Sequence, residues 1–72
     1  MIKNQLHDKV RKLVDQLPPE QREVVILRHY ADMSFKEISQ LTRVSINTAL
    51  GRMRYALINM RKMLETKETF LQ

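Results

Sequence analysis

The sequence lacks cysteine and tryptophan, and its 72 residues include only one glycine and two prolines. Without cysteine, neither disulfide bridges nor thiolate metal sites can support the fold. Turn-rich folds such as sandwiches and barrels are excluded, because their many turns draw on glycine and proline. We therefore expect one small domain over residues 1–72, nearly all of it helical and with a thin core.

Long apolar runs are also missing. The longest is Val24–Leu27, whereas a membrane-spanning helix needs about 20 apolar residues. Polar and charged residues such as Asn4 and Asp8 stand near the start of the chain, where a signal peptide would be apolar. We expect a cytoplasmic protein with no membrane partner.

Signals for catalysis or metal binding are few. A single glycine cannot build a glycine-rich phosphate loop. The two histidines, His7 and His29, stand apart from any nucleophile or metal-ligand set at useful spacing, so structural roles suit them better. We expect no enzyme activity, no cofactor and no bound metal.

Acidic residues are absent from residues 38–64, a stretch that holds five basic ones. Seven basic and six acidic residues nearly cancel in residues 1–37, and the last eight residues carry −1. One stretch therefore carries the positive excess of the whole chain, whose net charge is +5. Such a stretch favours an anionic partner, although a basic run can also be a solvated face without a ligand.

Apolar residues at helical spacing predict a first helix that ends at Pro18–Pro19, since proline disfavours helix in the residue before it. Pro19 also suits the first turn of a second helix, which we expect to run to about Tyr30. Ser34 and Glu37 have the capping-box form. They predict a third helix that ends near Leu41 or Thr42.

The third and fourth helices are the most informative pair. Ile38 and Leu41 form the apolar side of the third helix. Ser45 caps the fourth, which we expect over residues 46–64 or a little beyond. A short capped helix, a turn of about three residues and a longer basic helix together predict a helix-turn-helix over about residues 34–64.

The fourth helix has two unlike sides when its residues are placed at steps of about 100°. We expect its apolar side to pack on the domain through Ile46, Ala49, Met53, Ala56, Leu57, Met60 and Leu64. The opposite side has Gly51 at its centre and arginines at its edges. Because the second helix of a helix-turn-helix lies in the major groove, this side is expected to face DNA.

The side chains on that side suit DNA chemically. Asn47 and Thr48 can bond phosphates or base edges near the helix start, and Arg52 and Arg54 suit phosphate or guanine acceptors. Alternative interpretations stay open for some positions, since Asn47 can be only a solvated first-turn residue.

Gly51 and Tyr55 also have two interpretations each. Gly51 can allow a close approach to the duplex or can pack against a crowded neighbouring helix. Tyr55 can contact DNA through its ring and hydroxyl group, or it can be a half-buried ring.

Four segments together resemble region 4 of bacterial sigma factors of the sigma-70 family, and most closely the extracytoplasmic-function type. They are Leu17–Val25, Leu27–Arg28, Met33–Ser39 and Val44–Ala49, and the resemblance covers about residues 13–64. It implies an all-α, four-helix, winged-helix-like DNA-binding domain of the sigma region 4 type. Such a domain recognises the upstream (−35) promoter element while docked on the flap of the RNA polymerase β subunit.

The resemblance also assigns roles in the fourth helix. Thr48 and Arg52 match the family pattern and inherit phosphate-contacting roles, whereas Leu50 and Gly51 replace a basic residue and a serine at promoter-contacting positions. Arg54 and Tyr55 align with further contacting positions, the second of which is usually arginine. The complete predicted DNA-binding set is Arg43, Ser45, Asn47, Thr48, Leu50, Gly51, Arg52, Arg54 and Tyr55.

The resemblance implies protein partners as well. We expect the polymerase flap to occupy an apolar trough that includes Val24, Tyr30, Ile58 and Leu71. An anti-sigma factor is a further partner that the resemblance allows, and the free domain is expected to be a monomer. The chain has no counterpart of sigma region 2, so we expect an excised C-terminal domain rather than a natural stand-alone protein.

Two other functions remain as alternatives. One is the output domain of a LuxR-type regulator, which also uses four helices and usually dimerises. The other is a helical protein-interaction module, in which Met53, Met60 and Met63 would line an adaptable apolar groove. Methionine at helical spacing is more often part of a core.

Overall fold

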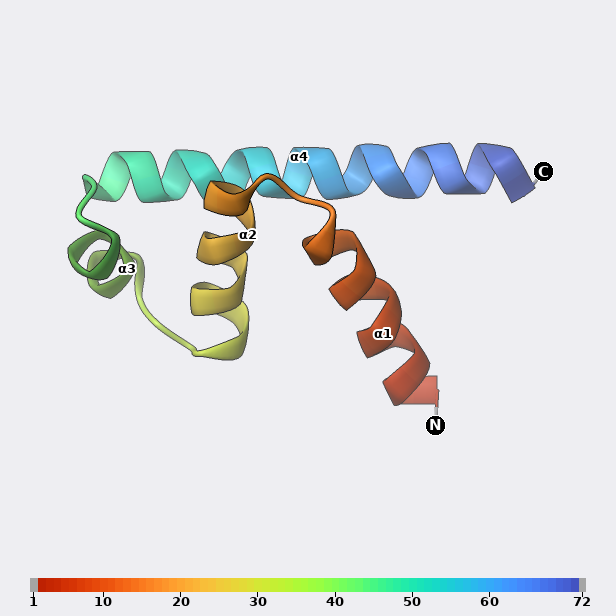
Figure 1. Cartoon of the computed structure of the whole chain (residues 1–72), viewed down its shortest axis with the longest axis horizontal. Helices are drawn as coiled ribbons and strands as arrows, with labels where there is room; N and C mark the ends of the chain where they lie inside the picture. Colours follow the sequence, from red (N-terminus) through yellow and green to blue (C-terminus); the bar gives the residue numbers. More distant parts are fainter. Residues whose placement is uncertain (1, 72) are drawn as a thin grey trace.

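The computed structural model describes the backbone of residues 2–71 and the side chains of residues 8–66. Its elements are the α-helices α1 (Ile2–Asp15), α2 (Pro19–Val25), α3 (Phe35–Thr42) and α4 (Ile46–Leu71), with the π-helical segment η1 (Ile26–Tyr30) after α2. Figure 1 shows α4 as a straight rod along the molecule, with α3, α2 and α1 on one side of it. No strand occurs in residues 2–71, which confirms the all-α prediction.

The predicted capping box forms the start of α3. The Ser34 backbone N–H donates to Glu37 Oε1 at 3.0 Å, and the Glu37 N–H donates to Ser34 Oγ at 3.1 Å. The hydrogen bond from the Ser34 backbone, helped by that of its side chain, lowers the pKa of Glu37 below its ordinary value. The box therefore sets where the helix-turn-helix begins.

The core draws on all four α-helices. Its buried cluster consists of Val14, Leu17, Val24, Val25, Ile38, Ala49 and Ala56. The two alanines on α4 are fully buried, so the small side chain lets α4 lie close to the helices beneath it. Met53, Met60 and Met63 are partly buried and pack against this cluster. Their packing on the cluster agrees with a contribution to the core, although Met63 also lines a surface hollow.

The second helix differs from the prediction, because its last five residues are wound as a π-helix. The Ala31 N–H donates to the Ile26 carbonyl, five residues back, at 3.1 Å. The Met33 N–H reaches the Leu27 carbonyl at 3.0 Å after Asp32 has turned the chain with a left-handed φ of 56°. The wider turn is stabilised by these closing bonds, which join residues on both sides of the bend.

The apolar side predicted for α3 was partly wrong. Ile38 is buried, but Leu41 is 61% exposed. The helix instead turns Phe35, Ile38, Ser39 and Thr42 inward, which is the stripe at spacings of three and four. Ser39 can be buried because its hydroxyl donates to the Lys36 carbonyl at 2.8 Å.

The apolar side predicted for α4 was too wide. Ala49 and Ala56 are buried, whereas Ile46, Leu57 and Leu64 are exposed. These three lie about 60–80° around the helix from Ala49. The helices α1–α3 cover only one side of α4 (Figure 1), so the buried arc is narrow.

The end of α4 also differs, since the helix continues to Leu71 instead of ending near Leu64. Neither glycine nor proline follows Gly51, so no residue of the usual helix-ending types interrupts it. Within the described part of the chain, no helix is both long and apolar enough to cross a membrane.

Candidate nucleic-acid interface

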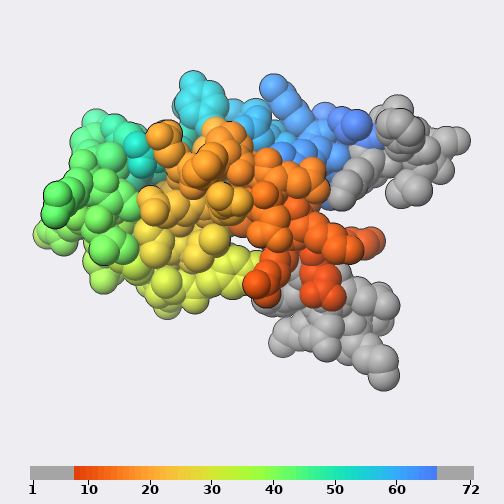
Figure 2. All heavy atoms as spheres, viewed as in Figure 1, coloured from red at the N-terminus to blue at the C-terminus, as the bar shows by residue number. Residues whose placement is uncertain are grey.

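The turn between α3 and α4 is held by a residue in the left-handed region. Arg43 has φ 59° and ψ 42°, and its backbone N–H donates to the Ser39 carbonyl. The Val44 N–H donates to the same carbonyl at 3.0 Å, and Val44 packs against the core. The turn therefore fixes α4 relative to α3, while the Arg43 side chain is exposed. In Figure 2 the helix α3, the turn and the first residues of α4, coloured green to cyan, form one end of the molecule.

The start of α4 is capped by a pair of hydroxyl groups. The Thr48 N–H donates to Ser45 Oγ at 3.0 Å, and the Ser45 hydroxyl donates to Thr48 Oγ1 at 2.9 Å. Ser45 is thus used in capping. The Thr48 hydroxyl only accepts in this pair, so its own proton can be donated to a phosphate oxygen.

The exposed side of α4 consists of two rows of side chains. Asn47, Leu50 and Arg54 form one row at spacings of three and four, and all three are exposed. Thr48, Arg52 and Tyr55 form the other row, in which Arg52 is half-buried and Tyr55 is 61% exposed. Tyr55 is therefore not the half-buried ring that one interpretation considered.

Gly51 lies between the two rows. Beyond the adjoining residues and the backbone of α4 itself, a Cβ placed there would have no heavy atom within 4 Å, so Gly51 does not pack against a neighbouring helix. Nothing inside the domain demands the absence of a side chain. The structure thus brings the predicted residues together around Gly51, at the N-terminal end of α4.

The charged side chains of α4 are all basic as far as Leu64. Exposed basic side chains follow α4 from Arg43 and Arg54 to Arg61 and Lys62. The first carboxylate after Glu37 is that of Glu65, whose Oε1 lies 3.5 Å from Arg61 Nε. A polyanion can therefore lie along the first five turns of α4 without meeting a carboxylate of that helix.

Arg28 helps to hold η1 against the start of α3, a role that the pattern of residues did not reveal. Its Nη1 donates to the Met33 carbonyl at 3.3 Å and lies 3.8 Å from Asp32 Oδ1. Its guanidinium carbon is 5.5 Å from the centre of the Phe35 ring. Arg28 thus ties η1 to the first residue of α3. Periodicity gives no sign of contacts across a bend, and only the Leu27–Arg28 element of the resemblance pointed to this position.

A second tie joins α2 to α4. Asn59 Nδ2 donates to Gln21 Oε1 at 2.7 Å, although the two residues are 38 positions apart. This bond is partly buried and fixes the middle of α4 on the domain. No local signal could have found it, because each residue alone has the polarity of a surface side chain.

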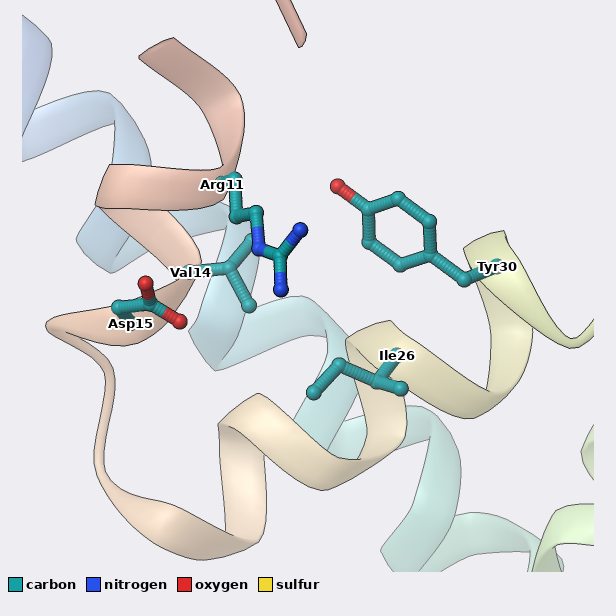
Figure 3. Close-up of a pocket in the computed structure, with 5 residues that line it drawn as sticks. All are labelled: Arg11, Val14, Asp15, Ile26 and Tyr30. Atoms are coloured by element: carbon teal, nitrogen blue, oxygen red, sulfur yellow. The ribbon is translucent and has the colours of Figure 1, made fainter. Parts of the chain in front are cut away.

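A hollow of about 250 Å³ lies between α1 and η1, away from the helix-turn-helix. Figure 3 shows the Arg11 guanidinium and the Tyr30 ring facing each other across it, with Val14 beside Arg11 and Ile26 below them in this view. Asp15 completes the lining. Ile26 and Tyr30 are exposed, so the hollow offers apolar surface beside a cation.

The apolar trough predicted from sequence is not formed as expected. Val24 is only 2% exposed and belongs to the core, because α2 turns it toward α4. Tyr30 is at the hollow, whereas Ile58 is exposed on the side of α4 turned away from the buried alanines. The side chain of Leu71 lies outside the described residues.

The described residues contain no group of three or more histidine, aspartate or glutamate side chains placed to hold a metal ion. His29 is exposed and meets the Tyr30 ring edge-on, with centroids 5.1 Å apart. The side chain of His7 is outside the described part.

Comparisons with known proteins identify the family. The model of a family described as "Sigma-70, region 4" matches residues 7–57, which include every predicted DNA-binding residue. The RNA polymerase sigma-E factor of Streptomyces antibioticus is 38% identical over 52 residues, which are 72% of this chain and 29% of that relative. The chain thus spans less than a third of the length of this curated relative. No solved structure matches this chain. The chain belongs to the sigma-70 family and corresponds to its region 4.

Proposed function

We propose that this domain recognises the upstream (−35) promoter element as part of an RNA polymerase holoenzyme of the extracytoplasmic-function type, in the cytoplasm. The observation that carries the proposal is the side of α4 around Gly51. It is exposed, lies at the start of the second helix of a helix-turn-helix, and meets no carboxylate on α4 before Glu65.

The two rows of α4 have different functions in binding, since one contacts phosphates and the other contacts bases. Arg52 and Thr48 hold phosphates, together with Arg43 at the turn, and these contacts position the helix without reading sequence. In the other row, Asn47 suits adenine N6 and N7, and Arg54 suits guanine O6 and N7. Gly51 lets the helix backbone lie close to the bases.

A salt titration tests DNA binding directly. The 72-residue chain is titrated onto a fluorescent duplex at several salt concentrations, and the affinity is measured by anisotropy. Four neutralised phosphates give a slope of about −3.6 for log affinity against log salt. The free domain is expected to bind weakly, because the polymerase normally supplies affinity by tethering. A slope near zero would contradict the proposal.

We propose that the hollow between α1 and η1 receives an apolar side chain of the polymerase β flap. Ile26 and Tyr30 supply the apolar surface, and Arg11 lies at the rim. A flap peptide is expected to shift the NMR signals of Ile26 and Tyr30 and to leave those of Asn47 and Arg54 unchanged. Shifts confined to α4 would contradict this site.

Residues 1–72 are proposed to act as one monomeric domain when free, with the helix-turn-helix over about residues 34–64. An anti-sigma factor remains a proposed partner. Gel filtration of the free chain checks the monomer, because a dimer would elute at twice the mass of 8.6 kDa.

A further inference from the structure

Leu50 is the apolar residue in the otherwise polar row that it forms with Asn47 and Arg54 on α4. It is 43% exposed, and its neighbours at spacings of three and four on the same row are the polar Asn47 and Arg54. The fold does not use its side chain, since Leu50 is neither in the buried cluster nor among the residues packed against it. A large aliphatic group is thus presented on the side of α4 that faces DNA in the proposed function.

The largest apolar group on the edges of the bases in the major groove is the 5-methyl group of thymine. The other apolar atoms there belong to small C–H groups, and the remaining groups are hydrogen-bond donors or acceptors, which leucine cannot pair. We propose that Leu50 recognises a thymine through this methyl group. The proposal rests on the DNA-binding function and names the base chemistry that the site selects.

The neighbours of Leu50 place that thymine within the recognised site. Asn47 and Arg54 are seven residues apart, or about 10.5 Å along the helix axis. This distance corresponds to about three base pairs at 3.4 Å each. The thymine therefore lies within a subsite of about three base pairs, between those faced by Asn47 and Arg54. Gly51 follows Leu50 and has open space around it, so the backbone can come close enough for van der Waals contact with a methyl group.

A competing use of Leu50 is contact with a protein. Ile46, Leu57 and Leu64 are also exposed and lie near Leu50 around the helix. Leu57 is 54% exposed and about 10.5 Å further along the axis, beyond the subsite. It therefore offers a matched control, an exposed leucine on the same helix without a base to contact.

The experiment removes single methyl groups from DNA. Duplexes are selected from a randomised pool with the wild-type chain at low ionic strength. In a selected duplex each thymine is then replaced by deoxyuridine, which lacks only the 5-methyl group and keeps the base pairing. Affinities are measured by anisotropy for the wild type, Leu50→Ala and Leu57→Ala, and thermal melts check that each variant folds.

One replacement is expected to weaken binding of the wild type about three- to five-fold, the change that corresponds to about 0.8 kcal/mol for one buried methyl-sized group. Leu50→Ala should be insensitive to that replacement, whereas Leu57→Ala should respond like the wild type. Binding in which no thymine is sensitive, or in which Leu50→Ala keeps the full sensitivity, would overturn the assignment and favour a protein contact. If no duplex is enriched and binding does not depend on salt, the proposed function itself is contradicted.

Discussion

Ala56 and Gly51 lie five positions apart on α4, and both are small, but their surroundings are opposite. Ala56 is fully buried against the other helices, so the core leaves no room for a larger side chain. At Gly51, no heavy atom beyond the adjoining residues and the backbone of α4 lies within 4 Å of the place where a Cβ would stand. The comparison separates a small residue required by packing from one whose smallness the fold does not require. The reason for Gly51 therefore lies outside the domain, in the partner that α4 approaches.

The largest effect on stability is expected from a larger side chain at the buried Ala56. Ala56→Leu adds three carbon atoms to a filled interior and should lower the free energy of unfolding by about 1–3 kcal/mol or more. Chemical denaturation measures this loss. DNA affinity at a temperature where the variant is folded should change little, and an unaffected midpoint would show that the core around Ala56 is loose.

The two rows of the exposed side can be separated by mutation. Asn47→Ala should change the preference among duplexes by about 1–3 kcal/mol at one base pair. Arg52→Ala should weaken binding to all duplexes about equally, because a phosphate contact carries no sequence information. A panel of duplexes with single base changes measures both. If both variants rank the panel like the wild type, Asn47 does not read a base.

Replacing Arg43 by glycine is expected to raise the stability of the domain and to weaken its binding to DNA. A residue other than glycine at φ 59° is strained, so Arg43→Gly should raise the stability by about 1 kcal/mol. The same change removes an exposed cation beside α4. The slope of log affinity against log salt should therefore become less steep by about 0.9. An unchanged slope would remove Arg43 from the interface.

The smallest effect is expected at the capping box. The pKa of Glu37 is lowered in the folded domain by its hydrogen bonds with Ser34, so the carboxylate stabilises the fold above its unfolded pKa. This contribution is lost as the pH falls through the lowered folded pKa. Glu37→Gln should therefore flatten the acid end of a stability profile. An acid end that Glu37→Gln leaves unchanged would contradict this role of the capping box.

Features governed by neighbours in sequence could be predicted. Ser34, Glu37 and Ser45 carry their capping function in their own side chains and spacing, and α3 and α4 begin where these residues place them. The position of Gly51 opposite the buried alanines follows from helical geometry alone.

Features that depend on distant partners could not be predicted. How much of α4 is buried depends on how many helices cover it, so periodicity alone assigned Leu57 and Leu64 to the interior. The contacts of Arg28 and the bond between Gln21 and Asn59 join segments whose meeting only the folded chain decides. The π-helical turn at Ile26–Tyr30 depends on such contacts as well.

The most direct test of the central claim is a pair of measurements on Gly51→Ala. Because glycine in a helix costs about 0.5–1 kcal/mol relative to alanine, and the added methyl group meets no atom of the domain, thermal melts should show a stability gain of about that size. In the same buffer the variant should bind DNA more weakly, and Gly51→Leu more weakly still, because the side chain stands between the helix and the duplex. Destabilised variants with unchanged DNA affinity would contradict the account and show that another side of α4 faces the DNA.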